Sequence, residues 1–192
     1  MQKIMKAQTL QTLQKAQTLQ KAQILQKAQI LQVDVFVDGC AVESVEAVKG
    51  AAIAPYQTWF QMWLSALDIA LSPINTYEVS LRLTDDAEIE QLNTDYRQQA
   101  KPTDVLSFAA LETDFPGMHA IYELEPLPLG DIIISVETAA CQAAKRDHSL
   151  IQEIAWLSAH GLLHLIGWDH PDAGSLRRML DQQAYLLSLV DI

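Results

Sequence analysis

The sequence predicts one α+β (or α/β) domain, in which a single mixed sheet of about four strands is covered by about five helices. Strand and helix patterns alternate along the chain, which is typical of a sheet packed against helices. Hydrophobic residues make up 49% of the 192 residues, enough to form a core. A chain of about 100–200 residues usually forms one domain. We expect the most apolar helix, which carries two histidines, to pack on the sheet.

The first half of the predicted sheet comes from two strands with a helix between them. Residues 33–37 alternate valine with other side chains, which predicts a strand that ends at Gly39. Residues 55–71 carry tryptophans and other apolar side chains at helical spacing, and Pro73 follows. Residues 77–83 (YEVSLRL) alternate again and predict a second strand.

The second half of the chain is predicted to contain four helices and two strands. Thr84 or Asp85 can cap a helix over residues 87–96, with Glu88 placed for a capping box. Two short apolar runs predict strands, and the segment between them is rich in proline and predicts a loop. The remaining elements are expected at residues 105–109 (strand), 111–128 (loop), 131–135 (strand), 136–146, 150–166 and 176–189 (helices).

Residues 1–32 form a basic hexapeptide repeat of the type QKAQIL. Six residues turn a helix through about 600°, so successive leucines share no face and a coiled coil is not predicted. We expect this low-complexity segment not to fold into the domain, which spans residues 33–192. The alternative is a basic tether for RNA or for a partner protein.

Charge and cysteine content narrow the classes of function. All 24 acidic residues follow Val33, which gives residues 33–192 a net charge of −16 and the repeat a charge of +5. Such an acidic body repels polyanions, so a role with nucleic acid requires a local cation site or a protein partner. Cys40 and Cys141 form no disulfide framework and no cysteine zinc site. No membrane-length apolar stretch or signal peptide is found, so we expect a cytoplasmic protein with no membrane partner and no nucleotide cofactor.

The segment HGLLHLIGWDH at residues 160–170 carries the chemistry. His160 and His164 are four residues apart and share one helix face. Gly167 can end the helix in a left-handed conformation, so that the chain turns back and brings in His170. Three neutral imidazoles leave one position of a tetrahedral Zn²⁺ open, the pattern of a catalytic site. The alternative, histidines scattered on an apolar helix, is disfavoured because burying several unpaired imidazoles is costly. We therefore predict one Zn²⁺ per chain.

The spacing HxxxHxxGxxH also matches the metzincin metallopeptidases at every position but one. Those enzymes carry a glutamate general base where this sequence has Gly161. Peptide cleavage must protonate a poor leaving group, and glycine cannot transfer a proton. A metallopeptidase is therefore a disfavoured alternative.

The same segment resembles the bacterial YbeY family, metal-dependent endoribonucleases of ribosomal RNA maturation. Three further segments agree with the family and occur in its order: LNTDYR at residues 92–97, PTDVLSF at 102–108 and LGDI at 129–132. The resemblance extends from about residue 33 to the C-terminus, and the repeat before it matches nothing in the family. Taken alone, PTDVLSF reads as core residues beside a turn, and Gly130-Asp131 as a turn before a strand.

The resemblance implies that His160, His164 and His170 are zinc ligands and that Arg97 is a catalytic residue beside the metal. Without the resemblance, Arg97 is more simply a favourable charge at a helix C-terminus. Asp169 either supports a ligand or accepts a proton, and its spacing does not choose between these roles. Two nucleophiles also stay open, a water activated by zinc and the ribose 2′-hydroxyl.

The function that the resemblance implies is a zinc-dependent, single-strand-specific endoribonuclease. It would process the 3′ end of small-subunit ribosomal RNA and act in late ribosome maturation and quality control. Its partners would be ribosomal RNA and the small ribosomal subunit, which an acidic body can approach through a basic ribosomal protein. The alternatives are the metallopeptidase and a non-catalytic ribosome-assembly factor whose metal only holds the helix turn.

Overall fold

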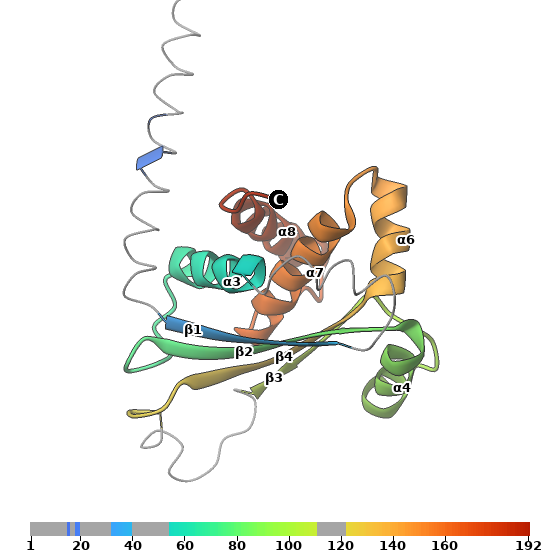
Figure 1. Ribbon diagram of the computed structural model, residues 1–192, viewed down its shortest axis with the longest axis horizontal. Helices are drawn as coiled ribbons and strands as arrows, with labels where there is room; N and C mark the ends of the chain where they lie inside the picture. Colours follow the sequence, from blue (N-terminus) through green and yellow to red (C-terminus); the bar gives the residue numbers. More distant parts are fainter. Residues whose placement is uncertain (1–14, 16–17, 20–31, 40–53, 111–121) are drawn as a thin grey trace, which may run out of the picture.

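The computed structural model describes residues 15, 18–19, 32–39, 54–110 and 122–192. Its centre is one four-stranded sheet with the order β1-β2-β4-β3 (Figure 1). Strands β1 (Gln32–Gly39), β2 (Thr76–Thr84) and β4 (Leu127–Ser135) are parallel, and β3 (Val105–Ala109) pairs antiparallel with β4 at one edge. The predicted mixed sheet of about four strands is confirmed.

Five helices in the described part of the chain cover the sheet, which confirms the predicted α+β class. Helices α3, α7 and α8 lie together over one face, whereas α4 lies beside the opposite face (Figure 1). Within the ranges that the structure describes, no helix is long and apolar enough to cross a membrane. The helices are α3 (Ala54–Leu67), α4 (Asp86–Arg97), α6 (Val136–Arg146), α7 (Leu150–Leu165) and α8 (Ala173–Leu187).

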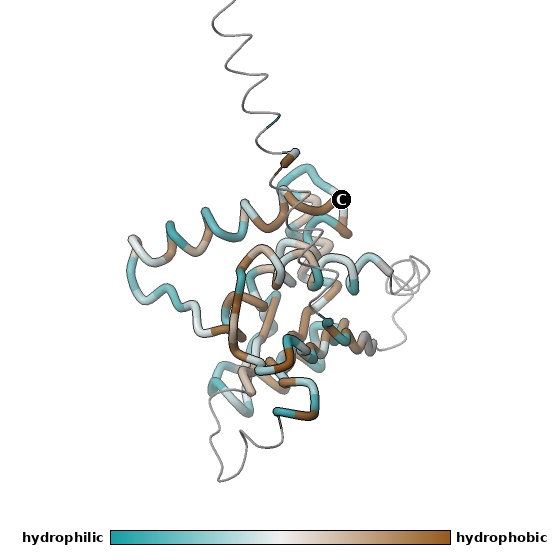
Figure 2. Tube along the Cα trace, turned by 90° about the vertical axis from the view of Figure 1, so that its left-hand side faces the viewer, coloured by the Kyte–Doolittle hydropathy of each residue, from teal (hydrophilic) through white to brown (hydrophobic). Residues whose placement is uncertain are grey.

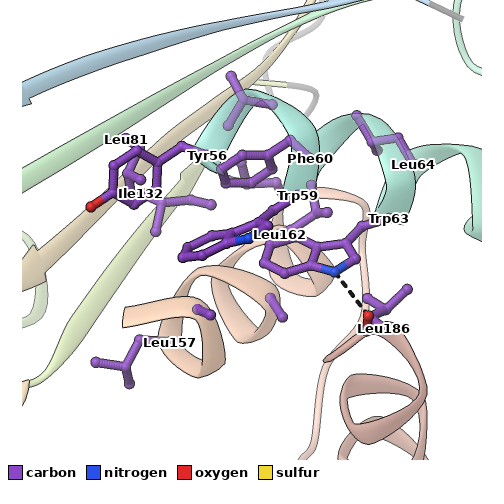
Figure 3. Close-up of a cluster of buried hydrophobic side chains, with 14 of the residues drawn as sticks. Tyr56, Trp59, Phe60, Trp63, Leu64, Leu81, Ile132, Leu157, Leu162 and Leu186 are labelled. Atoms are coloured by element: carbon purple, nitrogen blue, oxygen red, sulfur yellow. Dashed lines mark hydrogen bonds between the residues drawn. The ribbon is translucent and has the colours of Figure 1, made fainter. Parts of the chain in front are cut away.

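The main core lies between the sheet and helices α3, α7 and α8 (Figure 3). Trp59 and Trp63 of α3 are buried and their rings stack, with centroids 5.9 Å apart. The Trp63 indole also donates a 3.0 Å hydrogen bond to the backbone oxygen of Leu186, which ties α3 to α8. Hydrophobic stretches gather in the middle of the molecule and hydrophilic ones lie toward its outside (Figure 2). Because each large apolar side chain stabilises the fold by about 1.5–3 kcal/mol when buried, this core fixes α7 on the sheet.

A smaller cluster fixes α4 on the other face of the sheet. Ile89 of α4 packs with Leu106 of β3 and Ile133 of β4, all nearly or fully buried. Leu92 and Phe108 are half-buried against this cluster. The C-terminal end of α4 is therefore held next to the edge strand β3.

Helix α3 ends at Leu67, four residues earlier than predicted. Asp68 adopts a left-handed conformation with φ 52°, which ends the helix. The hydroxyl of Tyr77 on β2 then accepts hydrogen bonds from the backbone nitrogens of Leu71 at 3.3 Å and Ser72 at 3.2 Å. The backbone nitrogens of this segment therefore bond to a side chain of the sheet instead of continuing the helix.

Strand β4 begins at Leu127, whereas the sequence predicted a loop to residue 128 and a strand from 131. The register against β2 shifts beside Glu78, where Pro128 and Gly130 flank one extra residue of β4. Gly130 has φ 130°, and a Cβ atom there would lie 2.0 Å from the backbone oxygen of Phe108. Proline and glycine are tolerated in strands at such bulges. Gly130 is therefore part of a strand bulge and not of a turn. Most of the predicted loop, residues 111–121, lies outside the described residues.

The helix caps agree in part with the prediction. Asp85 is the N-cap of α4, and its carboxylate accepts a 2.8 Å hydrogen bond from the Glu88 nitrogen. The Glu88 carboxylate accepts from the Thr84 hydroxyl and pairs with Arg82 at 2.6 Å, so the predicted capping box does not form. Helix α8 begins three residues earlier than predicted because Asp172 caps it with a capping box of its own.

The N-terminal repeat falls almost wholly outside the described residues. Gln32 is the first residue of β1, and its nitrogen donates a 3.0 Å hydrogen bond to the backbone oxygen of Asn75. The division of the chain at residue 33 stays a prediction.

Candidate metal centre

The end of α7 is built so that the chain doubles back on itself. Gly167 has φ 88°, the left-handed conformation that the sequence predicted. The Trp168 nitrogen donates to the Leu163 oxygen at 2.9 Å, and the Gly167 nitrogen donates to the His164 oxygen at 3.0 Å. These two bonds form the Schellman motif that closes many helices. The chain after Gly167 consequently returns toward the histidine face of α7.

The turn brings His160, His164 and His170 together, as the sequence predicted. One nitrogen of each ring lies within 4.8 Å of the others, and the Nε2 atoms of His160 and His164 are 3.2 Å apart. In the part of the chain that the structure describes, these side chains form the one group of three or more that could hold a metal ion. Tetrahedral zinc with bonds of about 2.0–2.1 Å separates its nitrogen ligands by about 3.3 Å. The closest pair matches this separation, so the three donors could hold a metal ion, and three ligands leave one position of a tetrahedral ion open.

The surroundings keep two of these imidazoles neutral. Burial lowers the pKa of His160, and the neighbouring His164 lowers it further. Burial also lowers the pKa of His164, and His170 and Arg97 act in the same direction. Only the neutral imidazole offers a lone pair to a metal. Both rings are thus prepared to bind a cation at neutral pH.

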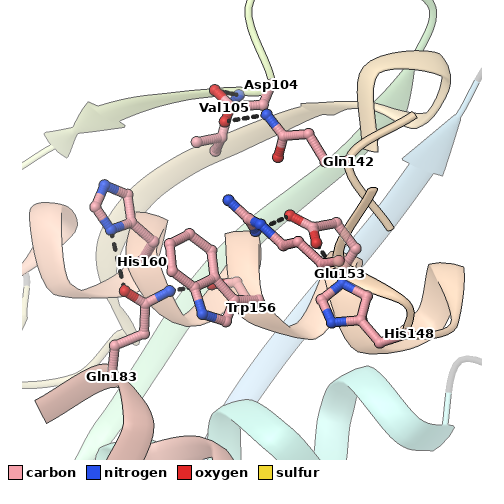
Figure 4. Close-up of polar contacts among 9 residues, drawn as sticks. Asp104, Val105, Gln142, His148, Glu153, Trp156, His160 and Gln183 are labelled. Atoms are coloured by element: carbon pink, nitrogen blue, oxygen red, sulfur yellow. Dashed lines mark hydrogen bonds and ion pairs between the residues drawn. The ribbon is translucent and has the colours of Figure 1, made fainter. Parts of the chain in front are cut away.

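The side chain of Gln183 on α8 contacts the ring of His160 and determines which of its nitrogens carries the proton (Figure 4). The Gln183 side-chain nitrogen donates to the Trp156 backbone oxygen at 2.7 Å, so its side-chain oxygen must be the atom 3.3 Å from Nδ1 of His160. That oxygen can only accept, and Nδ1 therefore carries the proton. The lone pair of Nε2 is then free to bind the metal.

Sequence reasoning missed Gln183, although the sequence contained a signal for it. The buried face of α8 runs through Ser175, Met179, Gln183 and Leu186. A fully buried amide such as that of Gln183 must find hydrogen-bond partners. A buried glutamine therefore indicates that α8 contacts polar groups of another element at this position.

Aromatic and ionic contacts connect the ring of His160 to α6. The Trp156 ring is nearly parallel to the His160 ring, with centroids 5.9 Å apart. The Arg146 guanidinium lies 4.8 Å from the centroid of a Trp156 ring and donates to the fully buried Glu153 carboxylate at 2.6 Å. His148 also pairs with Glu153 (Figure 4). Because this carboxylate is paired, its burial is tolerated and α6 is joined to α7.

Gly161 lies on the face of α7 that packs closely on the sheet. A Cβ atom there would lie 2.8 Å from Cγ2 of Ile132 and 3.0 Å from Oγ of Ser107. A side chain at this position would point into packed strands and not toward the three imidazoles. Close packing is thus a structural reason for glycine where metzincins carry their glutamate.

A cavity of about 740 Å³ opens beside the three imidazoles. Arg97, the last residue of α4, lines it together with Asp104 and Asp169. Asp169 accepts a 2.7 Å hydrogen bond from the backbone nitrogen of His170 and so supports the turn that carries this ligand candidate. Asp104 accepts a hydrogen bond from the Val105 nitrogen at 2.9 Å and another from the Gln142 side chain at 3.0 Å.

The segment PTDVLSF has a larger part in the site than its sequence suggested. Leu106 is buried, as expected, but Val105 and Phe108 are only half-buried. Residues 103–109 all line the cavity, because β3 is the edge strand beside it. The strand therefore forms a wall of the site.

The sequence pattern of the family described as Endoribonuclease YbeY matches residues 43–191. The chain belongs to the YbeY endoribonuclease family. A curated Endoribonuclease YbeY from Nostoc sp. is 52% identical over 169 residues, which cover 84% of this chain and 91% of that protein. The YbeY protein of Picosynechococcus sp. is 56% identical over 146 residues, covering 73% and 85%. A solution structure from Thermotoga maritima is 20% identical with a TM-score of 0.48, and covers 81% of this chain and 87% of that one.

Proposed function

We propose that this chain is a zinc-dependent endoribonuclease that cleaves single-stranded RNA at the centre formed by His160, His164 and His170. Its membership of the YbeY family supports RNA cleavage as the reaction. The approach of three imidazole nitrogens to within 4.8 Å, in a cavity that Arg97 also lines, supports this proposal most strongly.

Each of the named side chains has a defined part in the reaction. The three histidines would hold the metal through one ring nitrogen each, and Gln183 leaves Nε2 of His160 free to face it. Zinc bound there supplies Lewis-acid chemistry, which stabilises charge on a phosphodiester and activates a nucleophile. Arg97 binds a non-bridging phosphate oxygen through two N–H groups and neutralises charge that develops in the transition state.

The charge of the chain supports a local mode of RNA binding. The net charge at pH 7 is −11, which repels RNA at long range. A metal ion beside Arg97 offers a compact positive site that phosphate can reach at short range. Acidic surface elsewhere suits docking on a basic protein.

We also propose a cytoplasmic role in ribosome maturation, in which the protein processes the 3′ end of small-subunit ribosomal RNA and takes part in quality control. The partners are then ribosomal RNA and the small subunit, approached through a basic ribosomal protein. Cosedimentation of the purified protein with small ribosomal subunits tests this, and the salt dependence of binding reports on the charged interface.

The enzymatic test compares RNA and casein as substrates for the zinc-loaded protein, with and without a chelator. We expect cleavage of RNA that stops with chelator and returns with zinc, and no cleavage of casein. Cleavage of casein alone would favour the metallopeptidase. Cleavage of neither, by a protein that binds zinc and cosediments with ribosomal subunits, would favour the non-catalytic assembly factor.

A further inference from the structure

The cavity beside the three imidazoles is larger than a metal ion and one phosphodiester group would need. Its volume of about 740 Å³ lies within the range of about 300–1,000 Å³ that is typical of sites for drug-sized ligands. The cavity is lined by the edge strand β3, by the histidine segment and by Tyr96 and Arg97 at the end of α4. A nucleoside next to the phosphate therefore has room in the same cavity.

Tyr96 offers an aromatic surface at this cavity. Its exposed fraction is 67%, the largest of any aromatic residue that the structure describes. The Tyr96 ring meets the Phe108 ring edge-on, with centroids 4.8 Å apart and an angle of 65°. Phe108 is in turn half-buried against the small cluster under α4. The Tyr96 ring is thus anchored by one contact while most of its surface is open to the cavity and solvent.

Arg97 places a positive charge next to the aromatic ring of Tyr96. The two residues are consecutive at the end of α4, and both line the cavity. His160, His164 and His170 line the same cavity, so the guanidinium and the histidine cluster share one space. A cation for phosphate beside an aromatic ring for a base matches the two parts of a nucleotide.

We propose that Tyr96, anchored by Phe108, is the stacking surface for a nucleobase of single-stranded RNA whose phosphate lies at the metal centre. This inference rests on the endoribonuclease function proposed above. Every base has a π face, so stacking binds RNA with little preference for sequence. A paired base stays inside its duplex and reaches the ring only after unpairing, so the surface favours unpaired strands.

The first test measures RNA binding by the zinc-loaded full-length protein through fluorescence anisotropy. The probe is a fluorescein-labelled octauridylate with 2′-O-methyl riboses and phosphorothioate linkages, which resists cleavage. Tyr96→Leu keeps an apolar contact for Phe108 but removes the π face, and we expect Kd to rise on the order of ten- to hundredfold. Tyr96→Phe keeps the ring and should bind like the wild type.

Phe36→Leu is the matched control. Phe36 is also an exposed aromatic residue, with an exposed fraction of 57%, but it lies on β1 and does not line the cavity. Its replacement should leave Kd unchanged. An equal loss of RNA affinity in Phe36→Leu and Tyr96→Leu would mean that exposed aromatic residues bind RNA non-specifically, which overturns the inference.

A second set of probes, each lacking one base, shows whether Tyr96 meets a base. At one position, loss of the base should weaken binding by the wild type but not by Tyr96→Leu. A structural defect in Tyr96→Leu would instead weaken its binding to all probes by the same factor, and that result overturns the inference. Wild-type affinity in Tyr96→Leu, or no measurable binding by the wild type, overturns it too.

Cleavage of the unmodified octauridylate separates this inference from the function on which it rests. If the zinc-loaded wild type cleaves RNA while Tyr96→Leu binds normally, the stacking surface is rejected and the endoribonuclease stands. If the wild type cleaves no RNA, both are rejected.

Discussion

The side-chain oxygen of Gln183 lies 3.3 Å from Nδ1 of His160, so a residue of α8 fixes the tautomer of a metal-ligand candidate on α7. A histidine held in this way presents its other nitrogen in one orientation. Loss of such a supporting contact typically lowers metal affinity about 10- to 100-fold. Replacing Gln183 should therefore change zinc affinity, whereas replacing a core residue would change the stability of the fold.

We expect Gln183→Leu to weaken zinc binding about 10- to 100-fold while the protein stays folded. Leucine fills a similar volume but neither accepts from His160 nor donates to Trp156. Competition with a chromophoric chelator measures the affinity, and Gln182→Leu on the same helix is the matched control. Unchanged affinity in Gln183→Leu would show that the ring of His160 needs no such support.

Gly161→Ala should destabilise the protein. Alanine in place of glycine inside a helix normally stabilises it by about 0.5–1 kcal/mol, but here the new Cβ would lie 2.8 Å from Cγ2 of Ile132. Overpacking of a core typically costs about 1–3 kcal/mol, so we expect the free energy of unfolding to fall by up to about 2.5 kcal/mol.

Chemical denaturation of Gly161→Ala measures that loss. Gly174→Ala is the control, because a Cβ there meets only surface side chains, the nearest at 3.1 Å, and we expect a change within about 0.5 kcal/mol. A Gly161→Ala protein more stable than the wild type would mean that α7 can move away from the sheet without cost.

Local patterns were enough to predict most elements of the fold. Alternation predicted β1 and β2, and a short apolar run predicted β3. Spacing, capping residues and composition together predicted all five helices within a few residues at each end. The early end of α3 was not predictable, because it depends on the hydroxyl of Tyr77, which contacts the chain only after β2 joins the sheet. Pro128 and Gly130 hid the first half of β4 for a similar reason: a bulge is a property of two paired strands.

The candidate site was predictable where its residues are close in sequence. His160, His164 and His170 fall within one helix and one turn, so spacing alone placed them together. Gln183 and Tyr96 come from other helices, and their relation to the histidines depends on how α8 and α4 pack. The local sequence can mark Gln183 as an amide that needs hydrogen-bond partners, but it does not show which element supplies them.

The stability of the metal-free protein should fall as the pH drops below about 6.5, the usual pKa of an unfolded histidine. Burial lowers the pKa of His160 and of His164, so the unfolded chain binds more protons than the folded chain in this range. The stabilisation is complete above the unfolded pKa and is lost as the pH falls through the folded values.

Melting of the chelator-treated protein between about pH 7 and about pH 5.5 checks this pH dependence. The wild type should lose more in melting temperature than His164→Gln, which lacks one of the two shifted groups. Equal losses in both proteins would show that these imidazoles do not govern acid stability.

His164→Ala should lose most of the bound zinc. The substitution leaves two imidazoles, and a site with two protein ligands competes poorly with water. Metal analysis after gel filtration measures the zinc content, with about one equivalent expected for the wild type and far less for the variant. His148→Ala is a control, because His148 pairs with Glu153 and is not one of the three clustered histidines. Full zinc content in His164→Ala would mean that the ligand set is different.

Arg97→Ala separates a catalytic role of this residue from a structural one. If Arg97 stabilises the phosphoryl transition state, the variant keeps its fold and zinc but loses about 10²–10³ in cleavage rate. Arg97→Lys keeps the charge but not the planar fork, and should restore activity only in part. If Arg97 only complements the C-terminus of α4, alanine costs about 0.3–1 kcal/mol of stability and leaves cleavage per folded molecule nearly unchanged. Single-turnover cleavage and thermal melting of both variants distinguish these roles, with Arg177→Ala, an exposed arginine outside the cavity, as the control. Full activity in Arg97→Ala would remove this residue from the site.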